Sequence, residues 1–147
     1  MQVQQTCLLV VADGSRARLF EERRRGAPLA ERSDWMEGLA PESVEAPPRG
    51  RVFQRFGPGS HTVDSATPRE RSEERFLNDL AERVGMLVAR EGFDEVALIA
   101  PPRALGVLRA ALPSAAADRP GPSEPAERCE ETADELRAVL RRLRTGD

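Results

Sequence analysis

The sequence contains no lysine and no tyrosine, so all 22 of its basic side chains are arginines, and His61 is its single histidine. Cys7 and Cys129 are the only cysteines, and their number and separation exclude a disulfide framework or a cysteine-rich zinc site. The N-terminal apolar run, residues 7–12, is too short for a membrane span or a signal peptide, and no basic segment precedes it. The net charge of -3 excludes a globally basic nucleic-acid binder. We therefore expect a cytoplasmic protein that binds neither a membrane nor DNA.

The 147 residues fit one domain of ordinary size, and the first part of the chain predicts a β-hairpin. Residues 6–12 are a short apolar run typical of a buried strand, and residues 17–22 are a second strand-like stretch. Asp13-Gly14 lies between them, and both residue types tolerate a positive φ, which predicts a hairpin turn. A weaker third strand, at an edge of the sheet, is predicted around residues 29–36.

A long helix, a strand and a short helix are predicted between residues 67 and 112. Thr67 and Glu70 have the spacing of a capping box, and Pro68 occupies the first helical position. Apolar residues then recur every three or four positions until Gly92 ends the helix. Residues 95–100 read as a second buried strand and 103–112 as a helix. The fold class expected is α/β, a mixed sheet with an N-terminal hairpin and helices packed on at least one face.

The C-terminal third has a different composition. Residues 113–125 contain four prolines and little apolar surface, which predicts a linker. Residues 126–144 carry an apolar stripe that includes Cys129 and Leu136, which predicts an amphipathic helix. A helix this short is marginal alone, so it must pack on the domain or on a partner. The expected organisation is a domain at 1–112, a linker at 113–125 and a C-terminal helix within 126–147.

Four segments carry a family resemblance: LVVADGSRARLFE (9–21), RGRVFQRFGPGSHT (49–62), ERSEERFLNDLAERV (70–84) and FDEVALIAPPRALGVLRAAL (93–112). Together they resemble the bacterial family called "protein required for attachment to host cells". That family pattern continues with a strand and a Lys-Asp-Leu-Thr-like segment, whereas this chain has the proline-rich residues 113–125 and no lysine. The name implies a role in attachment to host cells and no particular chemistry.

The resemblance also implies a fold similar to the middle domain of archaeal and eukaryotic peptide-chain release factors. In those proteins a loop before the long helix carries a Gly-Gly-Gln motif that enters the ribosome. The corresponding stretch here, residues 56–61, has two glycines and no glutamine after them. The resemblance therefore implies contact with RNA or the ribosome without the release reaction.

Residues 46–63 form the main candidate site. Their local charge is +3, because no acidic residue lies between Glu45 and Asp64. Arginines bind phosphate, aromatic rings stack on bases, and glycines let the backbone approach a ligand, a combination suited to RNA. Arg16 and Arg18, on the outer face of the second strand, extend this basic surface. The candidate RNA- or anion-binding residues are Arg49, Arg51, Phe53, Arg55, Phe56, Gly57, Gly59, His61, Arg16 and Arg18.

Other chemistry-bearing residues have weaker support. His61 lies beside Ser60, which would serve a hydrolase acting through residues 57–64, but a general base also needs an orienting partner. Asp13 follows a strand, where a carboxylate can bind Mg²⁺, yet the turn already explains an aspartate there. Both cysteines read as small buried hydrophobic residues.

These observations predict a binding module rather than an enzyme, acting on RNA or the ribosome through residues 46–63. An adaptor that docks or self-associates through helix 126–144 is the alternative, and a hydrolase is the third. We expect no cofactor and no metal ion.

Overall fold

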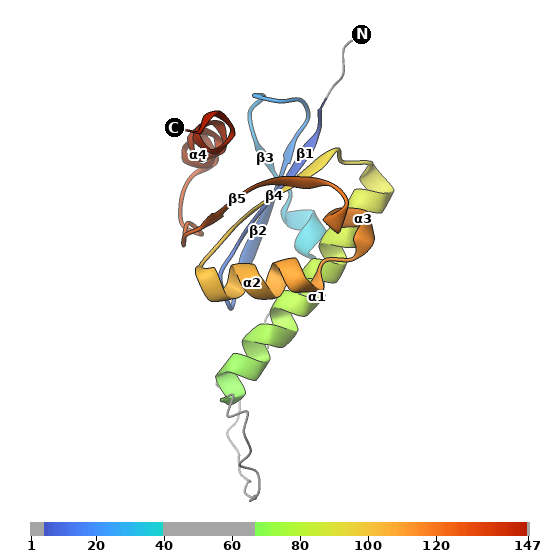
Figure 1. Cartoon of the computed structure of the whole chain (residues 1–147), viewed down its shortest axis with the longest axis vertical. Helices are drawn as coiled ribbons and strands as arrows, with labels where there is room; N and C mark the ends of the chain where they lie inside the picture. The colour runs from blue at the N-terminus through green and yellow to red at the C-terminus, as the bar shows by residue number, and fades with distance from the viewer. Residues whose placement is uncertain (1–4, 40–66, 147) are drawn as a thin grey trace, which may run out of the picture.

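A computed structural model describes residues 5–39 and 67–146 of the chain (Figure 1). Its centre is a five-stranded mixed sheet with the strand order β3-β2-β1-β4-β5. β1 pairs antiparallel with β2 and parallel with β4, β4 pairs parallel with β5, and β2 pairs antiparallel with β3. The strands are β1 (Cys7–Ala12), β2 (Ala17–Glu22), β3 (Ala30–Glu31), β4 (Glu95–Ala100) and β5 (Pro120–Pro125).

The β1–β2 hairpin is confirmed, but its turn differs from the predicted one. Residues 13–16 form a four-residue loop, closed by a hydrogen bond of 3.0 Å from the Asp13 N–H to the Arg16 carbonyl. The Asp13 carboxylate accepts further bonds from the Ser15 and Arg16 amides, at 2.8 and 2.9 Å. Gly14 is not among the described glycines that have a positive φ. The aspartate side chain therefore stabilises this turn without a left-handed glycine at position 14.

Helix α1 (Pro68–Glu91) is confirmed with both of its predicted ends. The Thr67 hydroxyl accepts from the Glu70 N–H, and the Glu70 carboxylate accepts from the Thr67 N–H, both at 3.0 Å. Gly92 caps the C-terminus at φ 77°, a left-handed conformation that favours glycine. The predicted helix after β4 is also confirmed, as α2 (Pro102–Ala111).

Helices cover both faces of the sheet, so the predicted α/β class is confirmed (Figure 1). On β1, Leu8 and Val10 belong to the core cluster shared with α1 and α2. Leu9 and Val11, which point the other way, belong to a second cluster shared with helix α4 (Ala133–Thr145). A central strand buried on both faces explains the continuous apolar run of β1.

The prediction that residues 113–125 are a linker is wrong. They contain helix α3 (Ser114–Ala117) and strand β5, which lies parallel to β4 at the edge of the sheet. An edge strand needs ladder hydrogen bonds on one side only, so it tolerates prolines that a central strand excludes. The strand that the family pattern places after α2 is therefore present.

The C-terminal helix begins later than predicted. Thr132 is the N-cap of α4, and its hydroxyl and the Glu135 carboxylate form a second capping box, so residues 126–132 precede the helix. Cys129 is buried but lies outside the helix. Leu136, Val139 and Leu140 are buried in the cluster beneath the sheet, so α4 packs on its own domain.

The weak third strand is confirmed as an edge strand but is only two residues long. It is followed by a 3-10 turn, η1 (Ser33–Met36), that buries Trp35. Trp35 contacts Phe93 edge to face, with ring centroids 5.7 Å apart. Within the described ranges, no helix is long and apolar enough to cross a membrane.

Candidate anion-binding site

The predicted RNA-contact segment, residues 46–63, lies outside the described residues, and its role stays a prediction. The candidates that fall there are Arg49, Arg51, Phe53, Arg55, Phe56, Gly57, Gly59 and His61.

Arg16 and Arg18 hold the segment before α4 against β2. The Arg16 guanidinium forms ion pairs with Asp13, Glu127 and Glu130 at 3.0, 3.5 and 3.3 Å. Arg18 binds both Glu31 carboxylate oxygens, at 3.0 and 2.9 Å, and this contact raises the pKa of the guanidinium. Its Nη1 also donates to the carbonyls of residues 129 and 131, at 2.9 and 2.7 Å. Both guanidiniums are thus bonded to protein oxygens.

Asp13 lies near Glu127 and Cys129, whose ligand atoms are all within 4.8 Å of one another. Partial burial opposes ionisation of Asp13, but hydrogen bonds from Ser15 and Arg16 outweigh it and lower the pKa of the carboxyl. Arg16 also binds Glu127. The Arg16 guanidinium therefore balances the negative charge of this cluster. The hairpin turn accounts for the aspartate at position 13.

A row of three polar or ionisable side chains crosses the α4 face at the start of β1. Cys7 pairs in register with Glu22 on β2 and with Glu95 on β4. Glu22 is 1% exposed, an unusual position for a carboxylate unless a cation accompanies it. Burial, followed by the two neighbouring carboxylates, raises the pKa of the Cys7 thiol far above its usual value. This thiol is therefore protonated and inert.

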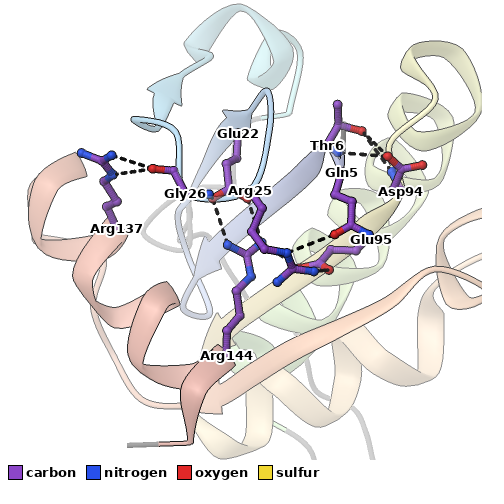
Figure 2. A network of polar contacts seen from close by, with 9 residues as sticks. All are labelled: Gln5, Thr6, Glu22, Arg25, Gly26, Asp94, Glu95, Arg137 and Arg144. Carbon is purple, nitrogen blue, oxygen red and sulfur yellow. Dashed lines mark hydrogen bonds and ion pairs between the residues drawn. The ribbon is translucent and has the colours of Figure 1, made fainter. Parts of the chain in front are cut away.

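Arg144, near the end of α4, supplies the cation for this row (Figure 2). Its guanidinium donates to both Glu22 carboxylate oxygens, at 2.9 and 2.7 Å, and to Glu95 at 2.8 Å. The Glu22 hydrogen bonds raise the pKa of Arg144, despite its burial. Two nitrogens meeting two oxygens is the bidentate geometry that lysine cannot provide.

A pocket of about 320 Å³ opens beside this ion pair, between α4 and the turn that follows β2. Arg137 donates to the Gly26 carbonyl at 3.2 and 2.6 Å (Figure 2). Arg25 donates to Gln5 at 3.0 Å and lies 3.6 Å from Glu95. The lining residues are Glu22, Arg25, Gly26, Arg137, Arg141, Arg144 and Thr145. Four arginines against one lining carboxylate make this a candidate site for an anion.

Sequence reasoning missed this pocket. Its arginines come from the turn after β2 and from α4, more than 100 residues apart, and no local motif links them. On α4, Arg137, Arg141 and Arg144 are spaced by four and three residues, which places them on one helix face. That spacing is the one signal available in the sequence.

The carboxyl ends of β1 and β4, where open α/β sheets commonly bind ligands, have a smaller pocket of about 200 Å³. Its one lining arginine, Arg103, already pairs with Glu70 at 3.4 Å and Glu74 at 3.9 Å. Glu73 also lines it. This end of the sheet is therefore poorly suited to a negatively charged ligand.

The fold and these contacts define a small mixed-sheet α/β domain that has an arginine-lined pocket under its C-terminal helix. The chain belongs to the family described as "protein required for attachment to host cells", whose model matches residues 8–140. The match includes β5 and most of α4. No curated protein matches the chain. The family description refers to attachment to host cells and specifies no enzymatic reaction.

Proposed function

We propose that this member of the host-attachment family is a non-enzymatic RNA-binding module, with residues 46–63 as its contact. The observation that carries the proposal is the composition of that segment. It contains Arg49, Arg51 and Arg55 with Phe53 and Phe56, and no acidic residue, in a chain whose net charge is -3. Arginine neutralises phosphates and phenylalanine stacks on unpaired bases, so this composition suits single-stranded RNA.

The beginning of α1 supports the proposal from the structural side. The segment leads into α1, whose N-terminal turns project beyond the sheet (Figure 1). Arg69 and Arg71 are exposed there, and neither forms an ion pair with any residue that the structure describes. These two guanidiniums are available to a phosphate close in the sequence to residues 46–63, although the same turns of α1 also carry Glu70, Glu73 and Glu74.

One observation weighs against the adaptor alternative. The apolar face of α4 packs under the sheet, so an adaptor would have to use another face of that helix. A hydrolase acting through His61 rests on a residue outside the described ranges and stays a prediction.

The test replaces Arg49, Arg51 and Arg55 together by alanine and measures binding of a fluorescent single-stranded RNA by anisotropy over a series of salt concentrations. Three lost phosphate contacts should make the negative slope of log K against log salt less steep by about 2. The matched control replaces Arg24, Arg90 and Arg119, exposed arginines elsewhere, and removes the same charge. An equal loss in both triple variants, or no loss in the first, contradicts the proposal.

A further inference from the structure

We propose that the pocket between α4 and the turn after β2 binds the phosphate group of a small organic phosphate monoester. The proposal is independent of RNA binding by residues 46–63. It rests on a charge count, on unused hydrogen-bond donors and on the size of the pocket.

The charges around the pocket do not cancel. Glu22 and Glu95 carry two negative charges, which Arg144 and Arg25 balance through contacts of 2.7 to 3.6 Å. The positive charges of Arg137 and Arg141 are left without a described carboxylate to balance them. Arg137 bonds the Gly26 carbonyl, which is neutral, and Arg141 has no hydrogen bond or ion pair within the described part of the chain. With Glu95 counted beside the lining residues, the arginines around the pocket exceed the carboxylates by two charges, which matches a phosphate monoester, with a charge of about -1.5 to -2 at neutral pH.

The pocket lining also offers hydrogen-bond donors that have no partner within the described ranges. Arg141 offers its whole guanidinium. Arg137 bonds the Gly26 carbonyl through its Nε and Nη2, which leaves its Nη1 without a partner among the residues described. Arginine forks recognise phosphate oxygens through paired hydrogen bonds.

The pocket walls are held in place before any ligand arrives. Gly26 has φ 88°, a conformation that favours glycine, and its N–H donates to Glu22 at 2.9 Å. Its carbonyl holds Arg137, and Arg144 is fixed by two carboxylates. Arginines that are already oriented lose less side-chain freedom when they bind an anion.

The volume of the pocket limits the size of the ligand. A pocket of about 320 Å³ lies at the lower end of the range for small-molecule sites, which is roughly 300–1,000 Å³. It has room for a phosphate and a sugar-sized group, and a dinucleotide exceeds it. We therefore choose ribose 5-phosphate as the probe, with ribose and inorganic phosphate as its two halves.

The experiment is isothermal titration calorimetry of the full chain with ribose 5-phosphate, ribose and inorganic phosphate. We expect ribose 5-phosphate to bind, ribose not to bind, and inorganic phosphate to bind more weakly. Arg141→Gln should lower the affinity for ribose 5-phosphate about tenfold, the value of one charge-assisted hydrogen bond. Arg119→Gln is the matched control, because Arg119 is also exposed and without an ion pair among the described residues, and it should leave the affinity unchanged.

Three outcomes overturn the proposal: no binding of ribose 5-phosphate at millimolar concentration, equal affinity in Arg141→Gln and the unaltered chain, or equal affinity for inorganic phosphate. Because Arg141 forms no hydrogen bond or ion pair with a described residue, Arg141→Gln should unfold at the same temperature as the unaltered chain, which separates lost binding from lost folding. The variant lacking Arg49, Arg51 and Arg55 should keep its affinity for ribose 5-phosphate. Failure of RNA binding and failure of this site are therefore distinguishable.

Discussion

Arg144, 12% exposed, and Glu22, 1% exposed, form a bidentate ion pair that joins the end of α4 to the end of β2. They are 122 residues apart in the sequence. Burying two charges is costly, and good geometry with extra hydrogen bonds is what offsets the cost. Glu95 and the Gly26 N–H supply those extra bonds. The pair therefore fixes where α4 lies on the sheet.

Replacing Arg144 by methionine should destabilise the fold by about 3 kcal/mol, because Glu22 would then be buried without a cation. The measurement is urea unfolding followed by circular dichroism. Arg141→Met is the matched control, since the Arg141 guanidinium lies on the same helix without a described partner, and it should change stability by less than about 0.5 kcal/mol. Similar losses in both variants would show that the ion pair has no special role.

Gly85→Ala should destabilise the protein, against the usual helix preference for alanine. A Cβ at Gly85 would lie 2.5 Å from the Pro113 Cγ, so α1 and the proline ring must move apart. We expect a loss of about 1–3 kcal/mol from this overpacking. Gly106→Ala on α2 meets nothing within 4 Å and should stabilise by about 0.5–1 kcal/mol. Equal signs for the two substitutions, in thermal or urea unfolding, would contradict the packing of Pro113 on α1.

The Glu124 carboxylate should contribute stability that disappears in acid. Hydrogen bonds from Arg128 at 2.6 Å and Arg142 at 3.1 Å hold the pKa of Glu124 below its usual value of 4.5. A depressed pKa stabilises the fold fully above pH 4.5, and the contribution is lost as the pH falls through the native pKa. Glu124→Gln should therefore be less stable at pH 7, by about 1 kcal/mol, and the difference should shrink as the pH falls below 4.5.

Urea unfolding of both proteins at several pH values checks this prediction. Glu130→Gln is the control, because the Glu130 side chain is 78% exposed and an exposed ion pair contributes little. A difference between Glu124→Gln and the unaltered chain that stays constant from pH 7 to pH 3 would rule out the proposed linkage.

Both thiols should resist labelling in the native protein. Burial, followed by the nearby Asp13 carboxylate, raises the pKa of Cys129 to about 11, and Cys7 is fully buried. At pH 8 only about one Cys129 in a thousand would be a thiolate. Ellman's reagent should therefore react slowly until urea unfolds the chain, after which both cysteines react. Fast labelling of the native protein at either cysteine would contradict this environment.

The sequence predicts elements well where local chemistry decides them. The capping box at Thr67, the apolar periodicity of α1 and Gly92 together mark that helix, and the structure has the same ends. The same signal could have placed the start of α4, since Thr132 and Glu135 repeat the spacing of Thr67 and Glu70. The prediction instead followed the apolar stripe that includes Cys129, and it therefore began the C-terminal helix too early.

Elements and sites that depend on contacts between distant residues could not be predicted from the sequence. Residues 120–125 contain three prolines and no other apolar side chain, so no propensity marks them as a strand, yet pairing with β4 makes them β5. A Cβ at Gly121 would lie 2.6 Å from the Val96 carbonyl oxygen, so glycine permits this close approach. The arginine-lined pocket could not be predicted from the sequence for a similar reason, because Arg25 and α4 meet only in the folded chain.

The most direct test of the central claim, RNA binding through residues 46–63, is cosedimentation of the full chain with ribosomes at low and at high salt. The account predicts comigration with ribosomes or a subunit at low salt, release at high salt, and no comigration of the variant lacking Arg49, Arg51 and Arg55. A chain that stays at the top of the gradient at both salt concentrations, or a triple variant that still comigrates, would contradict it.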